Sequence, residues 1–592
     1  MPERRRDPRA VREPGSVRRG RVPGAAGRRR GLQRRRRALL HVPRRVRRRQ
    51  VRRLAVSIAD LQAMRRVVAF GAVAALGLST LEAHAQNYRE MPIGGRTATM
   101  GGAGTAAGND SAMPYLNPAG LAGVPGDIFA VSAAAYSYTR RSFTNVMFPS
   151  GVPASFGFQQ DSASFATSTI GELPSSVMYF RHFGDLKAKI QHRLGISLVI
   201  PGARDVELIG SVGGRYTAFN GRYVNQVSAT SQQRSYYLGP SYAIALNPDL
   251  RLGLSLYGLY QRNQRTRAQQ FELSGFGGAL SGNGSGQLAA LQEAFSIAPI
   301  LGAQARLFSK LWAGLGVALP AIHVTGRERS NGTIASTRDG RSLSAVSQSD
   351  LGYFEPAPAR LNAGIAWEDR KGFSAAVDVH VYLPRDFGRR GTTAVEARQT
   401  GEVSRRQVIG TDESVERELV VDVSAGVEYA FTSLLSTRLG FFTDNPPRAT
   451  LDASDRDNGQ LTLQRFGGTL GLGIQAGSFD TTLGLVFARG TGRYVTVDQF
   501  GPGGAPGFTT VPTTETTSMI VFSGAVTVDE AKKAIRDALP VAVPLPDLEI
   551  GGTGTPAPWI PDPLPPEPKP PPPKVRRAVP EMIEPRPPAV RP

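Results

Sequence analysis

Apolar and polar residues alternate with a period of two along most of the central part of the chain. In residues 419–429 every odd position is Leu, Val, Ala or Tyr, with polar or small residues between them. Residues 373–381 follow the same pattern, and Asp378 and His380 stand among the intervening positions. Such alternation is typical of strands that have one apolar face and one polar or small face.

About 14 segments show this pattern. They lie near 128–138, 175–183, 193–200, 234–246, 251–262, 297–307, 311–319, 360–367, 373–382, 419–429, 434–442, 466–475, 480–488 and 518–526. No run after residue 85 approaches the 18 or so consecutive apolar residues of a membrane-spanning helix. The pattern therefore indicates an all-β fold.

The connections between these segments alternate in length. Short connections lie at 247–249, 309–310, 368–371, 431–433 and 476–478, and long ones at roughly 139–174, 201–233, 263–296, 320–359, 383–418, 443–465 and 489–517. Short turns on one side and long loops on the other are the connectivity of transmembrane barrels. Because a closed sheet leaves no backbone group unpaired in hydrocarbon, we predict a transmembrane antiparallel β-barrel of about 14 strands over residues 128–526. A soluble β-sandwich or propeller explains the alternation equally well, but not the asymmetric loops.

The first 85 residues differ from the rest in charge. Of the formal net charge of +23, residues 1–63 carry +18 and residues 64–85 carry +1, which leaves +4 for residues 86–592. An Arg-rich tract of this kind is expected to be disordered. It is either a nucleic-acid-binding arm or, as we favour, a segment upstream of the true start of translation. The nearly neutral remainder gives no reason to expect nucleic acid as a partner.

Residues 64–85 have the form of a secretory signal peptide. Arg65 and Arg66 follow Met64, residues 67–78 are uncharged and mostly apolar, and the small residues of Ala83-His84-Ala85 resemble a cleavage site. We therefore expect the mature chain to begin at Gln86 and to be exported.

No motif for catalysis or metal binding is found. The chain has no cysteine, which excludes disulfides and thiolate metal sites. His182, His192, His323 and His380 are far apart in the sequence and lack metal-ligand spacing. Gly471 and Gly473 lie in a strand pattern and open no helix, so they do not form a nucleotide-binding turn. We predict neither an enzyme nor a cofactor or metal site.

The segment before the first predicted strand is rich in glycine and other small residues. It reads GGRTATMGGAGTAAGNDSAMPYLNPAGLAG over residues 94–123. Dense glycine permits tight packing and positive φ in a confined space. We therefore predict that residues 86–127 fold inside the lumen of the barrel.

This segment resembles the N-terminal hatch of the FadL family of outer-membrane transporters, also called the TodX-like family. The residues that carry the resemblance are Gly94-Gly95-Arg96, Met100-Gly101-Gly102-Ala103, Asn109-Asp110-Ser111-Ala112 and Asn117-Pro118-Ala119-Gly120-Leu121. Weaker matches follow at 354–364, 426–429 and 438–446, so that the resemblance spans about 90–526. It implies a 14-stranded barrel, plugged by the hatch, that admits hydrophobic molecules through grooves among its external loops and releases them through a gap in its wall.

Candidate site residues come from the hatch and from one long loop. In the hatch, Gly101, Gly102 and Asn117-Pro118-Ala119 either move with the plug or anchor it by a turn. Arg96 either binds a substrate carboxylate or, as we favour, pairs with acidic residues of the wall. In the loop, a helix over 287–295 would place Leu288, Leu291 and Phe295 on one face. Phe271, Leu273 and Phe276 could extend that surface. This helix either forms a landing groove for the substrate or merely packs on the rim.

The C-terminal 66 residues, 527–592, depart from the expected end of a barrel. Residues 527–530 form a capping-box pattern that predicts a short helix over 531–539. Residues 540–592 contain 19 of the 44 prolines and should form an extended spacer. We place this tail in the periplasm, where it either reaches a partner or is passive.

Two functions remain open at this point. The first is transport of long-chain fatty acids or other hydrophobic compounds, aromatic hydrocarbons among them, through a plugged barrel in the bacterial outer membrane. The second is a non-transporting barrel that serves as an anchor or as an assembly or secretion partner. In both cases we expect a monomer in contact with outer-membrane lipids.

Overall fold

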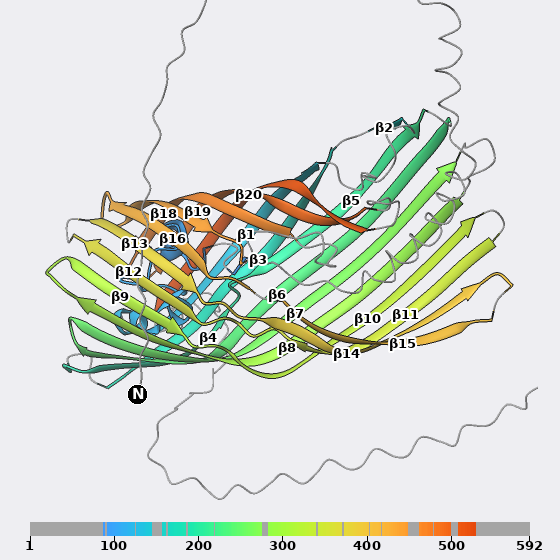
Figure 1. Ribbon diagram of the computed structural model, residues 1–592. Coiled ribbons are helices and arrows are strands. Elements are labelled where there is room, and N and C mark those ends of the chain that lie inside the picture. Colours follow the sequence, from blue (N-terminus) through green and yellow to red (C-terminus); the bar gives the residue numbers. More distant parts are fainter. Residues whose placement is uncertain are drawn as a thin grey trace, which may run out of the picture. The chain divides into compact units, whose positions relative to one another are not determined.

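The computed structural model describes most of the chain between residues 87 and 527 (Figure 1). The described ranges are 87–88, 92–124, 126–144, 157–161, 164–184, 188–217, 220–274, 282–338, 341–369, 372–401, 403–415, 417–447, 461–477, 479–498 and 507–527. The chain divides into two compact units, residues 1–534 and 535–592, and every described residue belongs to the first. The predicted signal peptide, the predicted helix over 531–539 and the Pro-rich tail lie outside the described residues.

Fourteen strands close into an antiparallel ring, which we call the base tier. In order around the ring, they are β1 (Ile128–Thr144), β3 (Ser164–Phe183), β4 (Gln191–Val199), β6 (Gly221–Asn247), β7 (Leu250–Ser274), β8 (Gly282–Arg306), β9 (Leu311–Ala318), β12 (Arg360–Glu368), β13 (Phe373–Tyr382), β16 (Val420–Ala430), β17 (Leu435–Asp444), β18 (Leu461–Ala476), β19 (Phe479–Asp498) and β20 (Gly507–Thr527). The first and last strands pair from Ile128 with Thr527 to Phe143 with Thr513, which closes the ring. This confirms the predicted fold, because each of the 14 predicted segments overlaps one of these strands.

Further strands extend the wall beyond the base tier. They are β2 (Phe158–Gln160), β5 (Ala203–Tyr216), β10 (Ile322–Arg338), β11 (Arg341–Phe354), β14 (Phe387–Gln399) and β15 (Arg405–Val415). Together with the outer parts of β6, β7 and β8 they form what we call the upper tier (Figure 1). The prediction that 201–233, 320–359 and 383–418 are loops was therefore wrong.

The two tiers meet at a level where several strands are interrupted. β4 and β5 pair with successive stretches of β6, and β9 and β10 pair with successive stretches of β8. The breaks contain Pro201, Pro320, Pro356, Pro358 and Pro384. Because proline lacks the N–H that a ladder needs, pairing stops there and the backbone can bend before the next strand begins.

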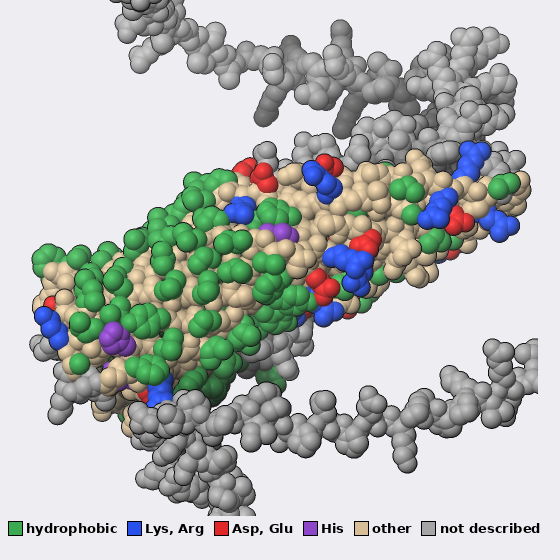
Figure 2. Space-filling view, turned by 90° about the horizontal axis from the view of Figure 1, so that it is seen from below, with side chains coloured by type: hydrophobic (Ala, Val, Ile, Leu, Met, Phe, Trp, Pro, Cys, Tyr) green, Lys and Arg blue, Asp and Glu red, His purple; other side chains and the backbone are tan. Residues whose placement is uncertain are grey.

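The outer face of the base tier is a belt of apolar side chains, seen in green in Figure 2. Exposed aromatic residues lie on both borders of this belt. Those near the short turns include Phe183, Phe308, Trp367, Phe373, Phe431 and Phe479, and those near the upper tier include Tyr138, Tyr260, Phe295, Phe354, Phe466 and Phe487. An apolar band flanked by aromatic girdles is the lipid-facing surface of an outer-membrane barrel. The base tier therefore spans the bacterial outer membrane.

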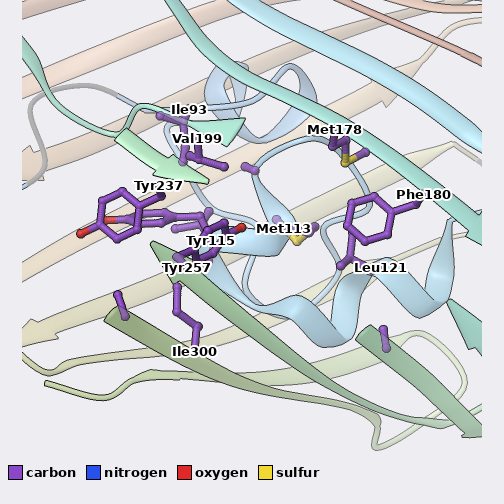
Figure 3. Close-up of a cluster of buried hydrophobic side chains, with 14 of the residues drawn as sticks. Ile93, Met113, Tyr115, Leu121, Met178, Phe180, Val199, Tyr237, Tyr257 and Ile300 are labelled. Atoms are coloured by element: carbon purple, nitrogen blue, oxygen red, sulfur yellow. The ribbon is translucent and has the colours of Figure 1, made fainter. Parts of the chain in front are cut away.

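The segment that precedes β1 folds inside the base tier. We call residues 92–124 the inner segment; it contains α3 (Arg96–Thr99), α4 (Met113–Leu116) and η2 (Pro118–Gly123). Its apolar side chains pack on the inner face of the wall (Figure 3), where Met113, Tyr115 and Leu121 meet Met178, Phe180, Val199, Tyr237, Tyr257 and Ile300. None of the described helices is long and apolar enough to cross a bilayer.

Candidate luminal binding site

The Asn-Pro-Ala sequence forms a buried turn that joins α4 to η2. Asn117 caps η2 by accepting a hydrogen bond from the Ala119 N–H at 3.2 Å. Its amide donates to the carbonyls of Thr105 at 2.7 Å and Ala303 at 2.9 Å. Pro118 occupies the first position of the helix, where its fixed φ is favourable and no N–H is required. The side chain of Asn117 thus ties two parts of the inner segment to β8.

Glycines of the wall make room for this turn. A Cβ built on Gly253 of β7 would overlap the backbone of Pro118, and one on Gly302 of β8 would overlap Asn117 Oδ1. On the opposite side, Gly101 has a φ of +69° and a Cβ there would overlap the backbone of Phe441 in β17. The adjacent Gly102 has a φ of +87°. Because only glycine fits at these positions, the inner segment lies directly against the backbone of the wall.

Ion pairs and charged hydrogen bonds also hold the inner segment. Arg96 Nε donates to Glu428 of β16 at 2.7 Å, and its Nη2 lies 3.5 Å from Glu368 of β12. Glu428 also accepts from Arg438 of β17 at 2.6 Å. Asp378 of β13 accepts two hydrogen bonds, both of 2.8 Å, from the N–H groups of residues 104 and 105. Of the two roles considered for Arg96, this geometry matches the ion pair with wall acids.

A cavity lies between α4 and the strand breaks. We call it the luminal cavity. It is lined by Asn87, Tyr88, Tyr115, Pro201, Gly202, Arg204, Gln233, Ser235, Tyr237, Gln261, Ala298, Ile300, Ala318, Leu319, Glu355, Pro356, Ala357, Pro358, Arg360, Tyr382 and Arg417. Residues 201–202, 319 and 355–358 come from the strand breaks, so the interruptions of the ladders contribute both to the bend in the wall and to the lining of the cavity.

Arg360 is the main cation on one side of the luminal cavity. Its guanidinium lies 3.9 Å from the centroid of the Tyr115 ring and donates to the Tyr115 carbonyl at 2.6 Å. Tyr115 in turn meets the Tyr237 ring edge-on at 5.1 Å. Arg360 is only 4% exposed, and its Nε has no hydrogen-bond partner among the described residues. A buried N–H without a partner favours a ligand oxygen there.

A second cation, Arg417, lies in an ion pair on the other side. Its Nη2 is 2.6 Å from Glu355, which also accepts a hydrogen bond from Tyr353. The guanidinium stands over the rings of Phe387 at 4.5 Å and Tyr88 at 5.5 Å. Burial raises the pKa of the Tyr88 phenol, although the positive charge of Arg417 opposes the shift. The phenol therefore stays neutral and can donate a hydrogen bond.

The rest of the lining is mostly apolar. Ala298, Ile300, Ala318, Leu319 and Pro356 contribute aliphatic surface. Each CH₂ of a ligand placed against such surface gains roughly 0.8 kcal/mol relative to water. The luminal cavity therefore combines aliphatic and aromatic surface with buried arginines, among them Arg360, whose Nε has no hydrogen-bond partner among the described residues. This is the combination expected of a site for an amphiphilic ligand.

An apolar cluster also fills part of the lumen in the upper tier. It comprises Phe143, Leu208, Val212, Val227, Leu461, Leu463, Tyr494 and Val511, from six different strands. Beside it, the Arg141–Glu515–Arg465 chain of ion pairs is buried, with contacts of 2.5 and 2.8 Å. Side chains therefore pack inside the barrel on both sides of the strand breaks.

The structure separates the residues predicted in the long loop. Residues 287–295 belong to β8, not to a helix, so that prediction was wrong. With a period of two, Leu288 lies on the opposite face of the strand from Leu291 and Phe295, and Phe295 is on the outer wall. These residues have the spacing of a helix face, but they form a strand because β8 pairs with β7 along one edge and with β10 along the other.

The remaining predicted residues lie in three places. Phe271 is buried on β7, where its ring covers Gly284. Leu273 also lies on β7, and Phe276 is outside the described residues. Asn117, Pro118, Ala119, Gly101 and Gly102 are all buried in the inner segment. Their roles in transport stay predictions.

Sequence reasoning missed the residues of the luminal cavity itself. Tyr115, Arg360 and Arg417 were not singled out, because they are dispersed over 300 residues and share no motif. The signal available was the polar face of the predicted strands, which includes Asp378 and His380 and faces the lumen. Within the described ranges, no group of three or more His, Asp or Glu is placed to hold a metal ion.

Comparison with known proteins identifies neither a family model nor a curated protein that matches this chain. Solved structures with a similar fold include a Pseudomonas aeruginosa FadL homologue, with 14% identity and a TM-score of 0.44, covering 75% of this chain and 100% of that one. The toluene transporters TodX of Pseudomonas putida and TbuX of Ralstonia pickettii each share 14% identity and a TM-score of 0.42, covering 74% of this chain and 98% of theirs. Similarity at this level does not by itself define an activity.

Proposed function

We propose that this protein takes up hydrophobic or amphiphilic compounds across the outer membrane through the luminal cavity. The observation that carries the proposal is the lining of that cavity, where aliphatic and aromatic surface surrounds the unsatisfied Nε of Arg360. The apolar part of this lining favours a solute with apolar surface. A molecule with a long alkyl chain or an aromatic ring gains in proportion to its buried surface.

The substrates proposed are long-chain fatty acids and aromatic hydrocarbons. A fatty acid would place its carboxylate against Arg360, since charge-assisted hydrogen bonds to arginine are the strong ones, and its chain against Ile300 and Leu319. An aromatic hydrocarbon would use only the rings of Tyr115 and Tyr237, through edge-to-face contacts. The two classes therefore depend on different parts of the same cavity.

The inner segment would act as the movable plug. It is held by side-chain hydrogen bonds and ion pairs that can be exchanged, such as those of Asn117 and Arg96, and the chain has no cysteine that could fix it by a disulfide. The close fit of Gly101 against Phe441 and of Asn117 against Gly302 leaves little free space between the segment and the wall. Passage would thus require the plug to shift while the wall stays closed.

Uptake by whole cells tests this proposal. A strain that lacks its own transporter would be given the gene, and uptake of labelled oleate and labelled toluene would be measured. We expect Ile300→Trp, which fills the luminal cavity, to reduce uptake of both compounds, whereas Ile365→Trp on the exposed outer wall leaves it unchanged. Heat-modifiable migration on gels would verify that both variants form folded barrels.

The same assay addresses the alternative of a non-transporting barrel. If uptake with the wild-type gene equals that of the empty vector for every hydrophobic solute tested, the transport proposal fails. A folded, inserted barrel with that behaviour would favour a role as an anchor or assembly partner.

A further inference from the structure

Three arginines on the outer wall stand just beyond the apolar belt, on the seam where the barrel closes. Arg140 of β1 and Arg489 of β19 both pair with Thr516 of β20, one from each side, so the three residues form one row across the sheet. Arg493 lies four positions further along β19. Since neighbouring strands are about 4.8 Å apart, the Cα atoms of Arg140 and Arg489 are separated by about 10 Å.

The row directly below these arginines belongs to the border of the lipid belt. Tyr138 precedes Arg140 by two residues, and Phe487 precedes Arg489 by two residues. Both aromatic rings are exposed on the outer face, at 46% and 56%. Exposed aromatic residues mark the level of the lipid headgroups. The arginines therefore lie at the height of the headgroups of the outer leaflet.

No acidic side chain neutralises this patch among the residues that the structure describes. The outward neighbours are hydroxyl groups, those of Thr491, Thr514 and Thr516. Arg493 donates to Thr510 at 2.8 Å, and neither Arg140 nor Arg489 forms an ion pair with another described residue. Three like charges beside an apolar belt repel one another. An anion bound among them would reduce this repulsion.

Two other exposed arginines of the outer wall have acidic partners. Arg327 of β10 forms an ion pair with Asp350 of β11, and Arg390 of β14 lies 2.9 Å from Asp412 of β15. On the face drawn in Figure 2, basic and acidic side chains likewise stand together beyond the belt. At the seam, by contrast, none of the described residues forms an ion pair with the three arginines, whose neighbours are hydroxyl groups.

We infer that the seam patch, defined as Arg140, Arg489 and Arg493 with the three threonines, binds the phosphorylated sugar headgroup of an outer-leaflet glycolipid. Guanidinium groups bind phosphate in bidentate fashion, and threonine hydroxyls suit the remaining phosphate and sugar oxygens. The acyl chains of such a lipid would lie on the belt below, against Tyr138 and Phe487. A soluble anion would lack this second contact, so the lipid is the occupant that uses the whole surface.

Binding to the intact protein in nanodiscs tests this inference. The thermal unfolding temperature would be compared in phosphatidylethanolamine nanodiscs with and without lipopolysaccharide, and bound lipopolysaccharide would be counted by native mass spectrometry. Each arginine near an anionic surface is expected to contribute about fivefold to affinity. The Arg140→Gln/Arg489→Gln variant should therefore bind roughly 25-fold more weakly and lose most of the lipopolysaccharide-dependent stabilisation.

The matched control is Arg327→Gln/Arg390→Gln, which removes two arginines whose charges are already paired. We expect this control to bind lipopolysaccharide as the wild type does. Equal loss in both variants would mean that general charge, not the seam patch, attracts the lipid. Unchanged binding in the seam variant, or equal stabilisation by inorganic phosphate in plain phosphatidylethanolamine nanodiscs, would overturn the inference.

Discussion

Asn117 of the inner segment and Gly302 of β8 fit together so closely that no side chain can be added between them. A Cβ at position 302 would overlap Asn117 Oδ1, while the Asn117 amide donates to the neighbouring carbonyl of Ala303 at 2.9 Å. The wall therefore follows the surface of the inner segment closely at this point, and single substitutions can weaken the contact between them.

Gly302→Ala should loosen the plug without opening the wall. The added methyl group displaces the Asn117 side chain, and overpacking of this kind typically costs about 1–3 kcal/mol. We expect greater susceptibility of cells to large antibiotics that the intact outer membrane excludes. Gly524→Ala is the matched control, because a Cβ there meets nothing within 4 Å. If both variants leak equally, or neither does, the contact does not secure the plug.

Asn117→Ala should expose the inner segment to protease. The substitution leaves the buried carbonyls of Thr105 and Ala303 without their donor, at a cost of about 1–3 kcal/mol. Trypsin cleavage after Arg96 in the detergent-solubilised protein should then become about tenfold faster, since cleavage follows the population of the opened segment. The control variant Asn331→Ala, at an exposed position of β10, should be cleaved at the wild-type rate. A wild-type rate in Asn117→Ala would show that the turn is held by other contacts.

Arg360→Gln should reduce uptake of one proposed substrate class more than uptake of the other. The variant removes the cation but keeps a hydrogen-bonding side chain, so it loses a charged hydrogen bond worth about 1.5–3 kcal/mol with a carboxylate. Oleate uptake should fall by roughly tenfold or more, while toluene uptake changes little. Arg390→Gln, on the exposed outer wall, should leave both unchanged. Equal loss of both substrates in Arg360→Gln would instead point to a structural role for its contact with Tyr115.

Val377→Arg should destabilise the barrel because it places a charge in the lipid belt. Val377 lies near the middle of β13 and is exposed on the outer face. An arginine at the membrane midplane costs about 2–4 kcal/mol. Unfolding by urea from lipid vesicles would measure this loss. Thr392→Arg, exposed on β14 in the upper tier, should be nearly neutral, and a similar loss there would contradict the assigned position of the membrane.

The base tier was predictable because its two faces have opposite chemistry. In β13, Val377 and Val379 face lipid while Asp378 and His380 face the lumen, so a period of two appears in the sequence. In β11 of the upper tier the two faces do not differ in this way, because serine stands on both, at 342 and 344 on one face and at 347 and 349 on the other. No alternation can be read from such a strand, and its pairing becomes visible only in three dimensions.

The close packing of the inner segment could be expected from its glycines, but the residues of the luminal cavity could not be predicted. Gly101 and Gly102 take positive φ in the structure, as a packed glycine-rich segment suggests. Arg360 is the first residue of β12, whereas Arg417 lies between β15 and β16, and they meet Tyr115 and Tyr88 only in the folded barrel. The spacing of these residues in the sequence does not indicate that they come together.

The seam between β1 and β20 has a consequence for the order of biogenesis. The polypeptide segment synthesised ahead of β1 ends up enclosed, yet the ring cannot be completed until residues 507–527, far downstream, reach their partner. The stretch of 33 residues, 92–124, is therefore either enclosed as the last strand pairs or enters through an end of the completed ring. In either order, the part synthesised first gains its contacts with Glu428 and Thr469 only after those much later strands have been synthesised.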